Sequence, residues 1–213
     1  MTTLPPALTS GYKRFRGTRY REEALRYTQL ADGQSPQTLI IACADSRVDP
    51  ATIFGAAPGE LFVVRNVANL VPPCSTTPSD LHGTSAALEF AVCQLGVRDI
   101  VVMGHGDCGG VAASLAAAEN RPVGQFVAPW VDLLSHSRDN ILADKSLTDQ
   151  SARQTALEHD GICLSLENLM SFAFVADAIA TKRLALHGVW FAIGSGILHW
   201  FNGETGRFES IEA

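Results

Sequence analysis

Long hydrophobic runs are missing from this sequence of 213 residues. Its longest apolar stretch, Phe172 to Ala180, is interrupted by Asp177, and Met1 to Ser10 contains no apolar core of the kind that a signal peptide needs. We therefore expect a cytoplasmic protein with no membrane partner.

Positive charge is also scarce. The sequence has 16 Lys and Arg against 22 Asp and Glu, which gives a formal net charge of −6. Proteins that bind nucleic acid neutralise phosphates with an excess of cationic side chains. We therefore expect no nucleic-acid partner.

The five cysteines are an odd number, and no spacing among them suggests a disulfide framework. In a reducing compartment, metal binding or packing is the more common use of cysteine. Cys74, Cys93 and Cys163 have no partner pattern, and we expect them to pack against other residues.

Neither repeats nor low-complexity linkers divide the chain, so we expect one α/β domain over residues 1–213. Residues 11–31 are predicted to form a helix. Short apolar runs at 38–42, 61–65 and 99–104 alternate with helical segments, which is typical of a mostly parallel sheet flanked by helices. A helix at 84–95, a surface loop at 71–80, mainly helical structure over 124–187 and late strands at 189–193 and 197–201 complete the prediction.

Two clusters of polar residues follow the ends of two of these predicted strands. Cys43 comes directly after the first strand, and His105 comes directly after the run at 99–104, with Cys108 three residues later. The carboxyl ends of parallel strands meet at one edge of a sheet, so these side chains should converge. Two thiolates and one imidazole suit zinc, and three protein ligands leave a fourth position free, as in catalytic sites.

A helix is predicted after Gly109-Gly110, over residues 111–118. Its positive end should favour a thiolate at Cys108. Asp107 is expected to cap this helix rather than take part in chemistry.

Five segments, in this order and at these spacings, closely resemble the β-class carbonic anhydrases. They are Gln34-Ser35-Pro36, Cys43-Ala44-Asp45-Ser46-Arg47-Val48, Pro58-Gly59-Glu60, the run from Phe62 to Val71, and Gly104-His105-Gly106-Asp107-Cys108-Gly109-Gly110. The resemblance implies one zinc ion per chain, bound by Cys43, His105 and Cys108. It also implies a protruding N-terminal helical arm, residues 1–31, that embraces a partner subunit, in a homodimer or a higher homo-oligomer.

The same resemblance implies catalytic roles for Asp45 and Arg47. It further implies that the substrate, carbon dioxide or bicarbonate, is bound by Gln34, Phe62, Val67 and Gly109. The sequence is nearer the plant-like subtype, because Gln34, Phe62 and Val67 match the substrate-pocket positions of that subtype. Ile40 stands where the other subtype has a tryptophan of an inhibitory bicarbonate site, so that regulation is not expected here. Phe90 is a departure, because plant-like members often have tyrosine there.

The expected reaction is the reversible hydration of carbon dioxide to bicarbonate and a proton, by attack of a zinc-bound hydroxide. Asp45 can accept a hydrogen bond from that hydroxyl group, and Arg47 can hold the carboxylate in a bidentate pair. If the pair breaks, Asp45 can become a fourth zinc ligand in a closed state. Gln34 can donate a hydrogen bond to a bicarbonate oxygen.

Two other interpretations stay open at this point. Zinc can serve folding or redox sensing in a protein without catalytic activity, with Asp45 closing the coordination shell. Alternatively, the same chemistry can act on a related cumulene such as carbon disulfide. The sequence also leaves open which of the five other histidines, if any, carries protons to solvent.

Overall fold

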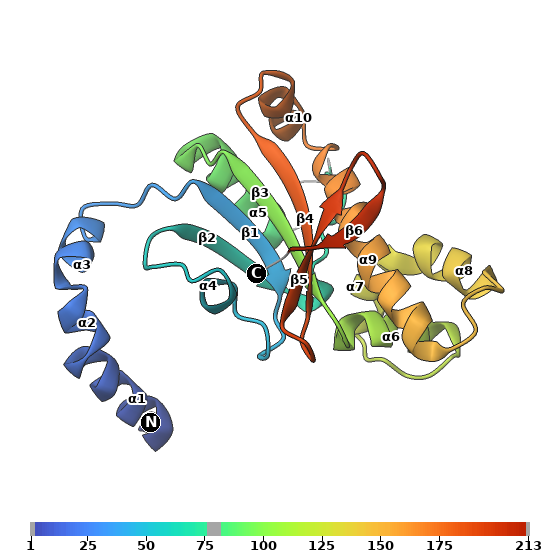
Figure 1. The fold of residues 1–213 in the computed structure, drawn as a ribbon, viewed down its shortest axis with the longest axis horizontal. Coiled ribbons are helices and arrows are strands. Elements are labelled where there is room, and N and C mark those ends of the chain that lie inside the picture. Colours follow the sequence, from blue (N-terminus) through green and yellow to red (C-terminus); the bar gives the residue numbers. More distant parts are fainter. Residues whose placement is uncertain (1–2, 76–81, 212–213) are drawn as a thin grey trace.

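The structure, a computed structural model, describes residues 3–75 and 82–211. These residues form one six-stranded sheet in the order β2-β1-β3-β4-β5-β6 (Figure 1). Strands β1 to β4 run parallel, whereas β4, β5 and β6 are antiparallel to one another. The strand bounds are Thr38–Cys43 (β1), Leu61–Asn66 (β2), Asp99–His105 (β3), Ala185–Ala192 (β4), Ile197–Asn202 (β5) and Arg207–Ser210 (β6).

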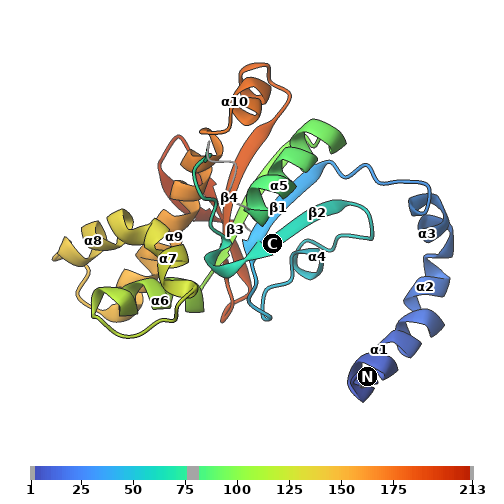
Figure 2. The ribbon, with the colours of Figure 1, turned by 180° about the vertical axis from the view of Figure 1, so that it is seen from behind.

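Helices cover both faces of this sheet, as the two opposite views in Figure 1 and Figure 2 show. Their bounds are Pro50–Ile53 (α4), Val67–Asn69 (η1), Gly83–Glu89 (α5), Phe90–Leu95 (η2), Gly109–Ala118 (α6), Val127–Val131 (α7), Asp132–Leu134 (η3), Ser135–Ala143 (α8), Gln150–Leu169 (α9) and Ala173–Ala180 (α10). The mostly parallel sheet with flanking helices that the sequence predicts is confirmed.

The core has two halves, one on each face of the sheet. Along β1, Leu39 and Ile41 pack with buried residues of α5, α9 and α10. Ile40 and Ala42 point the other way and pack with buried residues of α6 and of the segment 131–157. This alternation follows from the period of two in a strand, and it explains why β1 is apolar from Leu39 to Cys43.

The N-terminal arm consists of α1 (Pro6–Gly17), α2 (Arg19–Glu22) and α3 (Ala24–Leu30), and it extends away from the sheet (Figure 1). None of the residues in these three helices is buried. The prediction of one continuous helix over 11–31 is wrong, because the chain leaves helical geometry at Thr18, where ψ is −95°, and again at Glu23. The arm itself is as predicted.

The predicted helix at 84–95 is confirmed, as an α-helix that turns into a π-helix at Phe90, and Gly96, at φ 66°, ends it. Two further predictions need correction. Val71, the start of the expected surface loop at 71–80, is buried, and residues 76–80 of that loop lie outside the described residues. The helical region after residue 124 ends at α10, since β4 begins at Ala185.

Within the described part of the chain, no single helix is both long and apolar enough to cross a membrane. Helices α9 and α10 have that length and composition only when taken together, and the chain bends by 87° between them.

Candidate metal centre and active site

The candidate site lies where the order in which the chain adds strands to the sheet reverses. From β1 the chain goes outward to β2, then returns to β3 on the other side of β1. Cys43 is the last residue of β1, and His105 is the last residue of the neighbouring β3. The two residues therefore occupy the carboxyl ends of adjacent parallel strands, at a topological switch point.

Cys43, His105 and Cys108 form a compact group of possible metal ligands. All three are buried, and their ligand atoms lie within 4.8 Å of one another. The two Sγ atoms are 3.8 Å apart. Two sulfurs bound to one tetrahedral zinc ion at about 2.3 Å would be separated by about 3.8 Å. The spacing therefore fits zinc.

The histidine of this group is oriented for metal binding. Its Nδ1 lies 2.9 Å from the carbonyl oxygen of Gly106. Its Nε2 is buried and has no hydrogen-bond partner among the described residues. A bond from one ring nitrogen to a carbonyl is the usual way in which proteins fix the tautomer of a metal-binding histidine.

The side chains of Cys43 and Cys108 are hydrogen-bonded to each other. A hydrogen bond from Cys108, together with the nearby His105 imidazole and the backbone N–H groups of Asp45 and Ala68, lowers the pKa of Cys43 to about 4. The same thiol–thiolate bond and burial raise the pKa of Cys108, although the N–H groups of Val111 and Gly110 act against this. The hydrogen bond between the two sulfurs thus stabilises one thiolate of the pair. The preference of the helix end for a thiolate at Cys108 stays a prediction.

Asp45 and Arg47 form a bidentate ion pair beside the ligand group. The Arg47 Nε and Nη2 atoms donate to Oδ1 and Oδ2 at 3.0 and 2.7 Å, and the Arg47 backbone N–H also donates to Oδ1 at 2.9 Å. These bonds hold the pKa of Asp45 well below its usual range. The carboxylate Oδ2 lies 3.9 Å from His105 Nε2, so the pair stands next to the ligands.

Arg65 is a site residue to which the sequence analysis gave no role. Its guanidinium donates to the carbonyl oxygens of Cys43, Asp45 and Val48 at 2.9, 2.6 and 2.7 Å. Three bonds to one loop fix the backbone that carries Cys43 and Asp45. The only available signal was an arginine in a strand that otherwise reads as apolar.

The turn after β2 approaches the metal ligands closely. Ala68 and Asn69 are both in the left-handed region, at φ 63° and 49°, and both are buried. The side chain of Asn66 holds this turn, since its Oδ1 accepts from Leu70 N–H at 2.9 Å and its Nδ2 donates to the Leu70 carbonyl at 2.8 Å. Non-glycine residues in this region cost about 1–3 kcal/mol each and cluster at functional sites.

Asp107 does not cap α6 as predicted. It has φ 55°, and the residue at the N-cap is Cys108, whose side chain makes no capping bond. The left-handed turn at Asp107 directs the chain from His105 back toward Cys43.

Comparison with known proteins identifies the family. The family described as "Carbonic anhydrase" matches residues 38–198 of the chain. The chain belongs to the β-class carbonic anhydrases. It is therefore an enzyme, as predicted.

Several β-carbonic anhydrases share most of the length of this chain. A carbonic anhydrase from Pseudomonas aeruginosa is 38% identical, covering 96% of this chain and 90% of that protein. The structure of the β-carbonic anhydrase CcaA superposes with a TM-score of 0.90 at 28% identity, covering 97% of this chain and 92% of that one. A tetrameric β-carbonic anhydrase from Sordaria macrospora gives a TM-score of 0.79 at 31% identity, covering 97% and 96%.

Two of the four predicted substrate-binding residues of this carbonic anhydrase lie near the metal ligands. Val67 follows β2 directly. It lies against Gly110, two residues after the ligand Cys108, because a Cβ placed on Gly110 would be 2.6 Å from the Cγ1 atom of Val67. Gly109 is the first residue of α6, next to Cys108, and no other group lies within 4 Å of the position of its Cβ. The surface at Gly109 is open.

Gln34 and Phe62 do not reach this centre within one chain. Phe62 pairs with Leu39, whereas Asn66, four residues later, pairs with Cys43. Four residues of a strand span about 13 Å. Gln34 is exposed in the segment that leads into β1, at the end of the sheet away from α6 (Figure 1). Phe62 instead stacks on Phe90, with ring centroids 5.8 Å apart.

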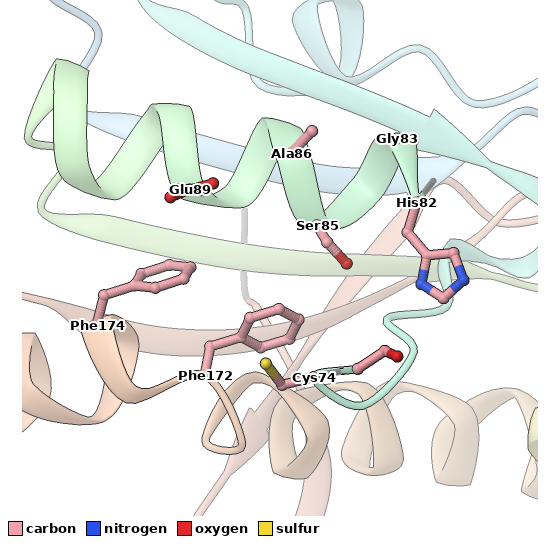
Figure 3. Close-up of a pocket in the computed structure, with 9 residues that line it drawn as sticks. Cys74, His82, Gly83, Ser85, Ala86, Glu89, Phe172 and Phe174 are labelled. Carbon is pink, nitrogen blue, oxygen red and sulfur yellow. The ribbon is translucent and has the colours of Figure 1, made fainter. Parts of the chain in front are cut away.

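The remaining cysteines of this carbonic anhydrase take no part in the centre. Cys74 and Cys93 are exposed, so the prediction that they pack is wrong, and Cys163 is partly buried. Cys74 lines a separate cavity of about 600 Å³, between α5 and the start of α10 (Figure 3). Phe172 and Phe174 form one wall of that cavity, and none of its lining residues belongs to the metal group.

Proposed function

We propose that this enzyme catalyses the reversible hydration of carbon dioxide to bicarbonate and a proton, with one zinc ion per chain. The observation that carries the proposal is the group of Cys43, His105 and Cys108, with the paired Asp45 and Arg47 beside it. Zinc bound there would lower the pKa of a coordinated water, so that hydroxide is available near neutral pH.

Asp45 would orient the attacking water by accepting a hydrogen bond from its O–H group. As a bidentate partner, Arg47 keeps the carboxylate ionised and fixed in one direction. We propose that Asp45 takes a fourth position on the metal only in a closed state, when it has left Arg47. Its present distance of 3.9 Å from His105 Nε2 supports this, because it places the carboxylate beside the ligand group.

We further propose that the enzyme works as a homodimer or a larger homo-oligomer. Gln34 and Phe62 lie at the end of the sheet away from their own metal ligands, so any contact with bound substrate must be made in a second chain. Val67 and Gly109 would serve the substrate in their own chain. The tetrameric assembly of the enzyme from Sordaria macrospora agrees with this arrangement.

The plant-like subtype is also part of the proposal. Ile40 is 1% exposed and packs in the core beside Cys43, where the other subtype has a tryptophan of a bicarbonate site. A single domain over residues 1–213 and a cytoplasmic location stay predictions.

Stopped-flow hydration of carbon dioxide across pH, with zinc quantified in the same samples, tests the proposal. We expect hydration that scales with zinc content. A zinc-loaded protein without hydration would instead indicate a structural metal. Turnover of carbon disulfide but not of carbon dioxide would show that the substrate is a related cumulene.

A further inference from the structure

Glu158 is a buried carboxylate that the proposed reaction does not use. It lies on α9 and is 3% exposed, although glutamate is rarely buried without a partner. All of its hydrogen bonds come from N–H donors. Oε1 accepts from Cys108 N at 2.9 Å and from Gln154 Nε2 at 3.2 Å, and Oε2 accepts from Trp190 Nε1 at 3.0 Å.

The peptide group between Asp107 and Cys108 is hydrogen-bonded on both sides. The N–H of this Asp107–Cys108 peptide donates to Glu158, and its carbonyl oxygen accepts from Arg47 Nη2 at 2.9 Å. One rigid planar group therefore connects Glu158 to Arg47, which in turn holds Asp45.

This peptide also needs such support. Asp107 is left-handed at φ 55°, a conformation that persists in a non-glycine residue only when its surroundings impose it. Trp190 adds a second restraint, since a Cβ placed on Gly106 would lie 3.1 Å from its Cζ2. Glu158 and Trp190 thus act together on the turn between His105 and Cys108.

We propose that Glu158 is a positioning residue of the metal centre. By accepting the Cys108 N–H, it fixes the thiolate ligand and, through the Asp107–Cys108 peptide, the direction of Arg47. This inference rests on the proposed zinc site and adds to it a residue that touches neither metal nor substrate.

The test compares three variants with the parent enzyme. Glu158→Gln keeps the size of the side chain, but its amide nitrogen must face the Cys108 or the Trp190 N–H donor. Trp190→Phe removes the donor to Oε2 and, because phenylalanine is smaller, also the contact of the indole ring with Gly106. Glu167→Gln is the matched control, because it makes the same change at an exposed position of the same helix. The measurements are zinc dissociation constants by chelator competition, the absorption spectrum of the cobalt(II) form, and thermal unfolding of the metal-free chain.

We expect Glu158→Gln to raise the zinc dissociation constant about 10- to 100-fold, as is common for groups that orient metal ligands. Its cobalt bands should shift, since the thiolate moves. Trp190→Phe should show a smaller change in the same direction, and Glu167→Gln should match the parent within twofold.

A Glu158→Gln enzyme that binds zinc within twofold of the parent, with unchanged cobalt bands, would overturn the inference, even if its unfolding temperature falls. If that variant does not fold, Trp190→Phe decides by the same criteria. A parent enzyme that binds no zinc would overturn the proposed function itself, which keeps the two failures apart.

Discussion

At the scale of single residues, the metal centre depends on hydrogen bonds. Some join residues that are close in sequence, and others join residues that are far apart in sequence. Asp45 and Arg47 are two residues apart, and their pair forms within one turn. Arg65 reaches the same turn from β2 and binds three of its carbonyl groups. The ligand loop is thus held by side chains more than by regular secondary structure.

Removing the Arg47 guanidinium should lower the hydration rate by about 100-fold, the usual loss when a preorganised polar contact is removed. With its partner gone, Asp45 is free to compete for the metal, so Arg47→Ala should also move the activity profile to higher pH. The pH–rate profile checks this, with zinc content measured at each pH. Arg121→Ala, at an exposed ion pair away from the site, is the control. A profile identical to that of the parent would reject the closed state of Asp45.

His159 should make folding stability depend on pH. Its ring stacks on Phe208 at 4.1 Å between centroids, and burial, with a contribution from His199, lowers its pKa to about 4. An unfolded histidine has a pKa of about 6.5. The unfolded chain therefore takes up the proton first, and stability falls as pH drops from about 6.5 to 4, by up to about 1.4 kcal/mol per pH unit.

Urea unfolding of the parent and of His159→Phe at pH 7 and pH 5.5 measures this dependence. The variant should lose less stability over that interval, while His136→Gln, at an exposed histidine, should behave as the parent. Equal losses in parent and His159→Phe would show that the ring is not buried in its neutral form.

The sequence alone predicted the three metal ligands because each follows a recognisable strand or lies in a short motif. It could not predict Glu158, whose contact with Cys108 spans 50 residues. Nothing in a helical segment marks one glutamate as buried until the helix is docked. Gln34 and Phe62 show a different limit of prediction from sequence. The spacing of motifs does not tell whether a residue contacts the substrate in its own chain or in a partner chain.

At the scale of elements, the start of α6 is pressed against the turn after β2. A Cβ on Gly110 would lie 2.6 Å from Val67 Cγ1 and 3.1 Å from the backbone nitrogen of Ala68. This contact brings the N–H groups at the start of α6 and the left-handed turn to the two thiols. The sequence predicted the helix, but the closeness of its approach depends on a turn conformation that no local pattern showed.

Gly110→Ala should therefore destabilise the enzyme by about 1–3 kcal/mol, the usual cost of overpacking, and weaken zinc binding. Gly109→Ala is the matched control, since open space surrounds that position and alanine favours a helix. Thermal unfolding and zinc content of both variants check the prediction. Equal stability of the two would contradict the close packing of α6 on Val67 and Ala68.

At the scale of the whole molecule, the N-terminal arm exposes apolar side chains to solvent. Leu25 is 83% exposed, and Leu8 and Tyr12 are more than half exposed. In the part of the chain that the structure describes, contacts such as Arg26 with Glu60 at 3.1 Å connect the arm to the rest of its own chain. Such surfaces normally meet a partner, and a second copy of the chain is the one that we propose.

Deletion of residues 1–31 should cause dissociation or aggregation, and Leu25→Ser should weaken self-association. Lys13→Ser, a polar exposed position of the same arm, is the control. Light scattering coupled to size exclusion measures the mass of each variant. A stable, active and monodisperse monomer after the deletion would refute the role of the arm.

The central claim is that Cys43, His105 and Cys108 hold the zinc on which hydration depends. Zinc per chain and carbon dioxide hydration, measured on the same samples of the parent, Cys108→Ala and Cys93→Ala, test it most directly. Cys93 is exposed and outside the centre, so its variant should keep one zinc per chain and full activity. Cys108→Ala should lose both zinc and hydration, whereas full zinc occupancy in that variant would contradict the account.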